Sequence, residues 1–316
     1  MRPRGLISVF LVLSCSKQPV QTNTEGIPDA GQPVVVEAVP LEPENHLPVV
    51  TLGEYSTEYS CEGKDEARAK NIELAASRLQ AWNENWNPGE EFSFNDAVGP
   101  RTSEAGFLNA PVIFMGETTA GIGGGVCQVS STLHAAALMS GLEVITRRPH
   151  TRFSKYIPHG LDATVAYPPE CNGNHRENIA NGKNPKCDSV DLILRNPFGF
   201  EISIKTFTEE SGLGKKRLRI WIEGAKNPIE KASYRIMQSG GVDFKRTFHK
   251  ISRIRTATYK KLVQSGQQGA HVTSFISYLM KDGTKKEISY RSEYPPVNET
   301  WEVGLLYDMS GPPPWE

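Results

Sequence analysis

A glycine-rich turn that leads directly into an apolar helix constrains the fold of this chain more than any other feature. The letters Gly-Ile-Gly-Gly-Gly occupy 121–125, and the largely apolar run 126–140 that follows ends at Gly141. Glycine reaches backbone conformations closed to other residues, and a glycine after the last apolar residue is typical of a helix C-terminus. The pattern predicts a largely buried helix over 126–140, entered through a tight glycine loop.

The remaining periodicities predict a mixed α+β fold. Apolar residues spaced i, i+3, i+4 and i+7 predict a helix over 65–82, and 92–98 is expected to be irregular or a strand. Alternating apolar residues and short apolar runs predict strands at 110–115, 142–146, 163–167, twice within 188–207, and at 218–222. From about residue 229 onward only strand patterns occur, including a hairpin around Asp282-Gly283. Helices near the start and strands afterwards favour α+β, with a separate small all-β module at the end.

Composition divides the chain into four expected parts. Residues 1–15 are interpreted as an export signal, and 16–49 as a disordered tether, because this Pro-, Glu-, Gln- and Thr-rich stretch lacks any helical or strand period. Such a segment cannot bury enough apolar surface to offset the entropy lost on ordering. Residues 50–225 are expected to form the main domain and 226–316 a β-rich domain.

The N-terminal segment also carries a possible lipid anchor. Arg2 and Arg4 precede a short apolar run over 5–13, too short to span a bilayer. The following Ser14-Cys15 resembles a bacterial lipobox, which implies that Cys15 is lipidated and holds the protein on a membrane surface. An ordinary secretory signal with an incidental cysteine is the alternative.

Overall charge and hydropathy exclude two classes of protein. Lys plus Arg number 35 and Asp plus Glu 36, for a net charge of −1 over 316 residues. General affinity for nucleic acid would require a strong basic excess, so no nucleic-acid partner is expected. No apolar run reaches the roughly 18 residues of a membrane-spanning helix, which argues against a polytopic membrane protein.

Cys127 is the candidate nucleophile, because it lies in the first turn of the predicted helix. The positive end of the helix macrodipole favours a thiolate there, and the thiolate is the nucleophilic form. The preceding glycines allow close approach of a substrate and can aim N–H groups at an oxyanion. On the local pattern alone, a buried structural cysteine is an equally good interpretation of Cys127. A phosphate loop and a Ser130 or Ser131 nucleophile are weaker, since no Lys-Ser/Thr and no Ser-x-x-Lys follows.

A nucleophilic cysteine requires a base and a group that orients the base. His150 follows the helix and one predicted strand, and His159 is a second candidate base. Asp162 begins the next predicted strand and is the candidate orienting group. The chain order Cys, His, Asp, with the cysteine on a helix packed on an antiparallel sheet, is that of papain-like and transglutaminase-like folds. His134 lies on the helix of Cys127 about two turns away, too far for a direct hydrogen bond.

Motifs over 51–207 resemble the VanW family, which is named after an accessory gene of vancomycin-resistance clusters. The matching segments are Phe92–Asn95, Val98–Thr102, Gly106-Phe107, Ala110–Ile113, Gly121–Leu133, Gly141–Glu143, His150 and Asp162–Val165. Some members act as L,D-transpeptidases, which cross-link peptidoglycan through a cysteine acyl-enzyme. The resemblance implies Cys127 as nucleophile, with His150 as base and Asp162 as its orienting group. The expected oxyanion and substrate contacts are Gly124, Gly125, Gln128, Ser130, Arg101 and Arg148.

The chain departs from the family pattern at an Asn- and Gly-rich insertion over 171–187. Cys171 and Cys187 flank it and are interpreted as a disulfide, which by loop entropy would stabilise the fold by about 3 kcal/mol. A zinc site using Cys171, His175 and Cys187 is a less favoured alternative because the ligand spacing is poor. Cys61 and Cys127 are expected to be free thiols, and no metal or cofactor is expected.

The C-terminal region resembles the five-glycine domain that often follows VanW domains. The matching residues are Gly266, Gly269, Asp282-Gly283, Tyr294-Pro295 and Val303-Gly304. The resemblance implies binding to wall polymers, and a simple spacer is the equal alternative.

Two functions follow as hypotheses. The first is a cysteine acyltransferase, an L,D-transpeptidase acting on peptidoglycan stem peptides, exported and lipid-anchored to a bacterial membrane so that it faces the cell wall or periplasm. The basic residues around the motif suit carboxylate-bearing stems, although a solvated face is the commoner role of such charges. The second is a lipid-tethered protein that binds the wall or glycopeptide without catalysis. The oligomeric state is not predicted.

Overall fold

The computed structural model describes residues 49–82, 85–114, 117–167, 189–308, 310 and 313–314. These residues belong to one compact unit. The predicted signal, Cys15, the tether and the insertion with Cys171 and Cys187 lie outside the described residues. Within the described part, no helix is long and apolar enough to cross a membrane.

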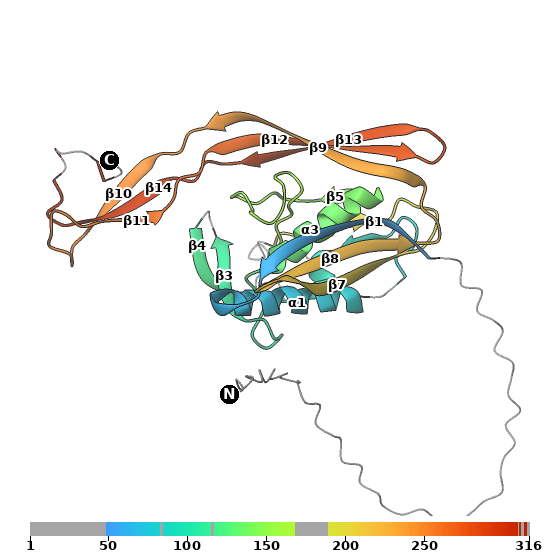
Figure 1. Ribbon diagram of the computed structural model, residues 1–316, viewed down its shortest axis with the longest axis horizontal. Coiled ribbons are helices and arrows are strands. Elements are labelled where there is room, and N and C mark those ends of the chain that lie inside the picture. The colour runs from blue at the N-terminus through green and yellow to red at the C-terminus, as the bar shows by residue number, and fades with distance from the viewer. Residues whose placement is uncertain are drawn as a thin grey trace, which may run out of the picture. The chain divides into compact units, whose positions relative to one another are not determined.

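A helix packed on a three-stranded antiparallel sheet forms the centre of the main domain. Helix α3 (Val126–Ser140) packs against β1 (Val50–Ser60) and β8 (Lys215–Gly224), and β7 (Ile202–Gly212) completes the sheet in the order β1-β8-β7. Figure 1 shows α3 lying along this sheet. The predicted alternation in β8 is confirmed, since Leu218, Ile220 and Ile222 are all fully buried.

The two predicted helices are confirmed. Helix α3 has the predicted bounds because glycines in left-handed conformations flank it, Gly125 with φ 109° and Gly141 with φ 76°. After the short 3-10 helix η1 (Gly63–Asp65), α1 (Glu66–Ala81) packs on β7 and α3. Burying its apolar face removes Ile72, Ala75 and Leu79 entirely from solvent.

Two smaller sheets carry the segments around the glycine turn. Strands β2 (Glu91–Ser93), β6 (Ile193–Arg195) and β5 (Glu143–Thr146) pair antiparallel in the order β2-β6-β5. Strands β3 (Asn109–Phe114) and β4 (Glu117–Ile122) form an antiparallel hairpin. The hairpin leads directly into the turn before α3 (Figure 1).

The expectation of an irregular or extended segment throughout 92–98 is partly wrong. The chain turns into the short helix α2 (Phe94–Val98) directly after β2. The hydroxyl of Ser93 caps this helix by accepting from the N–H of Asp96 at 3.1 Å. Such a cap offsets the cost of unpaired N–H groups, and its signal, a single serine, is too short to separate a helix from a loop.

The predicted strand at 163–167 is also wrong. Its residues belong to no strand: Ala166 forms an isolated bridge with Val190, and the N–H of Thr164 donates to the carbonyl of Arg148 at 2.8 Å. The carbonyl of Ala163 instead accepts from the hydroxyl of Ser130 in α3 at 2.7 Å. Its buried and partly buried residues alternate as in a strand, but its backbone pairs with helix side chains, which periodicity does not reveal.

The C-terminal region is built of strands, as predicted. Strands β9 (Ile229–Val242), β12 (Gly269–Met280) and β13 (Lys285–Tyr294) form an antiparallel sheet in the order β13-β12-β9, and the expected turn at Asp282-Gly283 joins β12 to β13. A second sheet has the order β10-β14-β11. Its strands are β10 (Arg246–Ile251), β11 (Lys260–Gln264) and β14 (Glu299–Gly304), with β10 and β14 parallel (Figure 1).

The C-terminal sheet shares an apolar core with the main domain. Ile276 and Tyr278 of β12 cluster with Ala135 and Leu138 of α3. The hydroxyl of Tyr278 also donates to the carbonyl of Leu138 at 2.7 Å. The all-β region is therefore continuous in packing with the helix that carries Cys127.

Candidate active site

Close backbone packing sets the position of Cys127, the second residue of α3. At Gly124 an added Cβ would lie 2.5 Å from the carbonyl oxygen of Pro111, and at Gly125 it would lie 2.9 Å from that of Arg68. Real Cβ atoms do not approach backbone this closely. Glycine at these two positions is therefore required to bring the turn against its neighbours and to start the helix with Cys127 in its first turn.

Cys127 lies in an environment that favours its thiolate. The side chain is partly buried, and its thiol donates to the carbonyl of Val165 at 3.4 Å. Burial raises the pKa of the thiol, but a hydrogen bond to His150 and the charge of its imidazole outweigh burial, so the pKa is lowered overall. The backbone at Val165 and the charge of Arg101 lower it further.

One ring nitrogen of His150 is hydrogen-bonded to Asp162, and the other remains for Cys127. Its Nδ1 lies 2.7 Å from Oδ2 of Asp162, which leaves Nε2 as the ring nitrogen for the thiol. Burial lowers the pKa of His150, but the bonds to Asp162 and Cys127 outweigh burial and raise that pKa to about 9. A lowered pKa on Cys127 and a raised one on His150 both favour the charged forms, a thiolate beside an imidazolium.

Asp162 is buried and accepts hydrogen bonds on both oxygens. Besides His150 on Oδ2, the guanidinium of Arg147 donates to Oδ1 at 2.8 Å and the hydroxyl of Tyr294 donates to Oδ1 at 2.5 Å. Burial alone would raise the pKa of this carboxyl. The hydrogen bond to His150, the charge of Arg147 and the Tyr294 bond outweigh burial and hold the pKa well below its usual range.

The structure places the two candidate bases differently. His150 joins Cys127 to Asp162, whereas His159 stacks on Phe153 with ring centroids 3.8 Å apart and planes 13° apart. His134 is buried in α3, where it contacts the carbonyl of Leu161 at 2.7 Å. The structure thus brings together the predicted Cys127, His150 and Asp162, and it leaves His159 outside the chain of hydrogen bonds.

Two of the expected substrate contacts have internal partners instead. The amide of Gln128 accepts from Arg68 at 2.5 Å and donates to the hydroxyl of Thr57 at 3.0 Å. The hydroxyl of Ser130 donates to the carbonyl of Ala163. Both side chains are buried, so they hold the helix in place rather than face a ligand. A motif shared with a family does not separate such packing roles from contacts with substrate.

Arg101 lies against the turn, where its charge acts on Cys127. Its Nη1 donates to the carbonyl of Gly99 at 2.8 Å, and its guanidinium stands over the ring of Phe94, 5.5 Å from the centroid. Burial lowers the pKa of Arg101 to about 10. The buried Nη2 has no hydrogen-bond partner among the described residues. Arg148, in contrast, has an exposed side chain.

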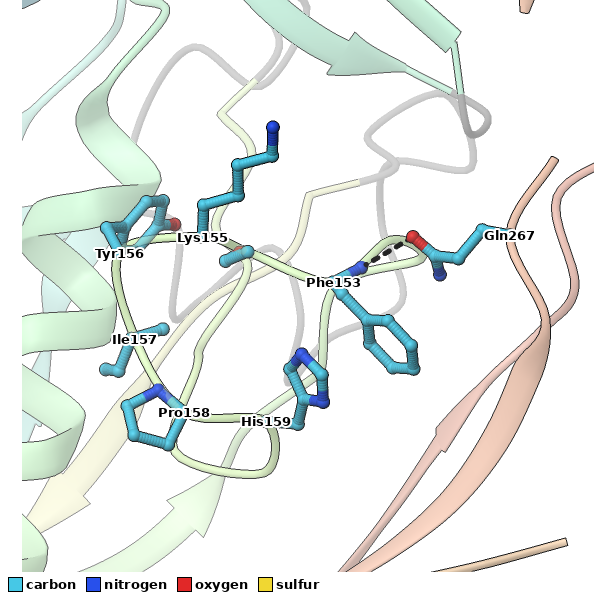
Figure 2. Close-up of a pocket in the computed structure, with 8 residues that line it drawn as sticks. Phe153, Lys155, Tyr156, Ile157, Pro158, His159 and Gln267 are labelled. Atoms are coloured by element: carbon cyan, nitrogen blue, oxygen red, sulfur yellow. Dashed lines mark hydrogen bonds between the residues drawn. The ribbon is translucent and has the colours of Figure 1, made fainter. Parts of the chain in front are cut away.

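A groove of about 630 Å³ is lined by residues that follow His150 in the chain, and Cys127, His150 and Asp162 are not among its lining residues. Figure 2 shows its lining: the loop Phe153–His159 on one side and Gln267 of the C-terminal region on the other. The side chain of Gln267 accepts from the N–H of Phe153 at 3.2 Å. Tyr156 connects the groove to the site, since its ring stands edge-on to that of His150 with centroids 6.5 Å apart.

Two partners of Asp162 were not identified from the sequence. Arg147 belongs to the basic residues around the motif, and Tyr294 belongs to the residues of the C-terminal resemblance. Tyr294 is separated from Asp162 by 132 residues, and no short-range pattern connects positions so far apart. For Arg147, its proximity to His150 in the sequence was a weak signal. For Tyr294, the sequence offered no signal.

The cysteines that the structure describes are both free, as expected: Cys61 and Cys127. The predicted disulfide Cys171–Cys187 and the alternative zinc ligands lie outside the described residues. Among residues that the structure describes, no group of three or more His, Cys, Asp or Glu side chains could hold a metal ion.

Comparisons with known proteins agree with the sequence resemblance. The family model described as VanW like protein matches residues 67–217. The protein named "Uncharacterized protein YoaR" from Bacillus subtilis (strain 168) is 43% identical over 122 residues, which are 39% of this chain and 39% of that protein. The chain thus matches well under half the length of this relative.

A solved structure titled "Crystal structure of HP0197-G5" is 14% identical, with a TM-score of 0.14, and covers 23% of this chain and 96% of that chain. The turn before Cys127, the helix that begins there, His150 and Asp162 all fall within the matched family range. Residues 67–217 of this chain are therefore a VanW-like family domain.

Proposed function

We propose that the protein is a cysteine acyltransferase that acts on peptidoglycan stem peptides as an L,D-transpeptidase. The observation that carries this proposal is the hydrogen-bonded series of Cys127, His150 and Asp162, with Nδ1 of His150 2.7 Å from Asp162. A cysteine paired with an oriented imidazole at a helix N-terminus is the arrangement that nucleophilic acyl transfer requires. The substrate class comes from the VanW resemblance.

The reaction divides into acylation and deacylation. The Cys127 thiolate attacks a carbonyl carbon of the donor stem, and a tetrahedral oxyanion forms. When this collapses, the peptide C–N bond breaks, and His150 gives its proton to the departing amine, which leaves a thioester on Cys127. An acceptor amine then attacks the thioester while His150 removes its proton, and the thiolate is regenerated. Water in place of the amine would give hydrolysis.

Two donors suit the oxyanion, one at the start of α3 and one on the side chain of Arg101. The first-turn N–H groups of a helix have no acceptor within the helix. Of these, Val126 donates to Gly123 and Gln128 donates to Gly125, while the N–H of Cys127 has no acceptor among the described residues. Nη2 of Arg101, which has no hydrogen-bond partner among the described residues, is a second donor, and the charge of Arg101 acts on the thiol of Cys127. Such preorganised donors stabilise developing negative charge.

The groove beside Tyr156 is the proposed seat for the stem peptide. Its volume of about 630 Å³ lies in the range of small-molecule sites. Lys155 on its wall is exposed and positively charged, which suits the carboxylates of a peptide stem. Figure 2 shows Lys155 and Tyr156 on the same loop, and the ring of Tyr156 lies 6.5 Å from that of His150, centroid to centroid.

The proposed place of action is the outer face of a bacterial membrane. Export by the N-terminal signal and lipidation of Cys15 would anchor the chain there. The tether over 16–49 would let the domain reach the cell wall or periplasm, because Pro-rich segments stay extended. Peptidoglycan stems and the membrane are the partners of this proposal.

Mass spectrometry of muropeptides tests the proposal. Purified wild-type protein is incubated with peptidoglycan fragments alongside Cys127→Ala and, as a matched control, Cys61→Ala. We expect new cross-linked or trimmed stems with wild type and Cys61→Ala and none with Cys127→Ala. Products from Cys127→Ala would refute the acyl-enzyme. Binding of fragments without products in any of the three would instead favour a lipid-tethered wall-binding protein.

A further inference from the structure

The last residue of β13 reaches into the site from the C-terminal region. The hydroxyl of Tyr294 donates to Oδ1 of Asp162 at 2.5 Å and accepts from the N–H of Gly160 at 2.6 Å. Tyr294 is 2% exposed, so water does not compete for these bonds. One hydroxyl therefore fixes both the carboxylate that orients His150 and the backbone two residues before that carboxylate.

A second residue of β13 supports the other donor to Asp162. Ser292 lies two positions before Tyr294, so both side chains point to the same face of the strand. The hydroxyl of Ser292 accepts from Nη1 of Arg147 at 2.5 Å, while Nη2 of Arg147 donates to Asp162. Of the two groups that donate to Oδ1 of Asp162, Tyr294 therefore belongs to β13, and Arg147 is hydrogen-bonded to β13 through Ser292.

The same tyrosine contacts the loop that lines the groove. The ring of Tyr294 lies 5.0 Å from that of Phe153 and 5.9 Å from that of His159, centroid to centroid. Gly160, whose N–H donates to the hydroxyl of Tyr294, directly follows this loop. In Figure 2, Phe153 and His159 stand next to each other on the side of the groove that faces the C-terminal strands. A movement of β13 would shift the groove and the carboxylate together.

We propose that Tyr294 is a positioning residue for Asp162, so that the C-terminal β region completes the active site of the VanW-like domain. This inference rests on the proposed function for its chemistry, in which His150 must be aligned with Cys127. Without the hydroxyl, Oδ1 of Asp162 keeps only Arg147, and the buried N–H of Gly160 loses its acceptor. The carboxylate and the imidazole that it orients then lose part of their alignment.

The test compares Tyr294→Phe with Tyr278→Phe in the full chain. Both substitutions remove only a buried hydroxyl by which the C-terminal sheet contacts the main domain, but Tyr278 donates to Leu138, away from Asp162. Alkylation of Cys127 by iodoacetamide is followed against pH, peptide by peptide, by mass spectrometry. This readout reports the thiolate–imidazolium pair and does not require acyl transfer, so it stands even where the proposed function fails.

We expect Tyr294→Phe to lower the alkylation rate of Cys127 at neutral pH by roughly tenfold and to move the acid limb of its profile toward that of an ordinary thiol. Tyr278→Phe should keep the wild-type profile. Ser292→Ala should give a smaller change of the same sign, because it acts through Arg147. A wild-type profile for Tyr294→Phe would overturn the proposal. Equal changes in both tyrosine variants would also overturn it, because they would indicate that the hydroxyls serve only to dock the sheet.

Discussion

His150 contacts one oxygen of Asp162 twice: its backbone N–H and its Nδ1 both lie 2.7 Å from Oδ2. The two contacts fix the main chain and the ring of His150 relative to a single buried atom. Because Nδ1 is committed in this way, Nε2 is the nitrogen that serves Cys127. The reactivity of the cysteine therefore depends on how firmly Asp162 itself is held.

The first prediction concerns the reactivity of the two described thiols. An ordinary thiol is only about a few per cent ionised at neutral pH, whereas His150 lowers the pKa of Cys127. Iodoacetamide should therefore modify Cys127 faster than Cys61 at neutral pH. In His150→Ala this advantage should largely disappear. Equal rates at the two cysteines in wild type, measured by peptide mapping, would contradict the ion pair.

The second prediction separates the two histidines. His150→Ala should lower the rate of acyl transfer by roughly 10²–10⁴-fold, the usual effect of losing a general acid–base group. His159→Ala should change the rate far less, because His159 stacks on Phe153 and does not touch Cys127. The rate of stem-peptide turnover by mass spectrometry is the measurement. A larger loss in His159→Ala would transfer the role of base to that residue.

The third prediction concerns the dependence of stability on Asp162. Asp162→Ala should reduce the free energy of unfolding by about 3–5 kcal/mol, because it leaves Arg147, 5% exposed, without its buried partner. Glu66→Gln breaks a pair of which both members are about 60% exposed and is the matched control, with no measurable change expected. Urea unfolding at neutral pH measures both.

The sign of the pH effect on this stability follows from the lowered pKa of Asp162. A carboxylate whose pKa is lower in the folded state contributes stability that is fully present above its unfolded value of about 4. That contribution is lost as pH falls through the folded value. Because Asp162 also raises the pKa of His150, the stability difference between wild type and Asp162→Asn should be constant only from about pH 5 to about pH 6, below the unfolded pKa of histidine, and should narrow in acid. A difference that widens on acidification would show that Asp162 is not held as a carboxylate.

The fourth prediction concerns a close approach between Gly160, which follows the loop Phe153–His159, and the C-terminal sheet. At Gly160, φ is +86° and an added Cβ would lie 2.1 Å from the hydroxyl of Ser274 in β12, whereas at Gly89, φ is +75° and the space is open. Gly89→Ala should cost about 1–2 kcal/mol of backbone strain. Gly160→Ala should cost about 1–3 kcal/mol more, because of the overlap.

Rescue by a second substitution checks the cause. The hydroxyl of Ser274 is buried and has no hydrogen-bond partner among the described residues, so Ser274→Ala alone should change stability little. Combined with Gly160→Ala it should recover much of the additional loss, as measured by urea unfolding. No recovery would place the cost of Gly160→Ala elsewhere.

The fifth prediction concerns the membrane anchor. If Cys15 is lipidated, Cys15→Ala should release the protein from the membrane fraction or block its maturation, and metabolic labelling with a fatty acid should mark the wild type only. Replacement of Ser16 by alanine is a neighbouring control that keeps the cysteine. An unlabelled wild type, together with unchanged fractionation of the variant, would favour an ordinary secretory signal.

Local signals were enough for much of the fold and for three site residues. Helix α3 was predicted with its bounds because Gly125 and Gly141 mark its ends through their own backbone conformations, whatever surrounds them. Cys127, His150 and Asp162 lie within 36 positions of one another and on recognisable elements, so their chemistry could be assigned from order and type. The helix α2 was missed because its only signal is the cap at Ser93.

By itself, the sequence predicted the helix that carries Cys127, the candidate nucleophile, and two candidate bases, since residue type and short-range spacing suffice for these predictions. Only the tertiary structure placed His150 rather than His159 beside Cys127, buried Gln128 and Ser130 against internal partners, and brought the hydroxyl of Tyr294 to Asp162. These outcomes depend on which side chains meet once distant segments pack together. The contact between β13 and Asp162 spans 132 residues, and such a contact leaves no trace in local periodicity, because it is set by the packing of a sheet on a helix core.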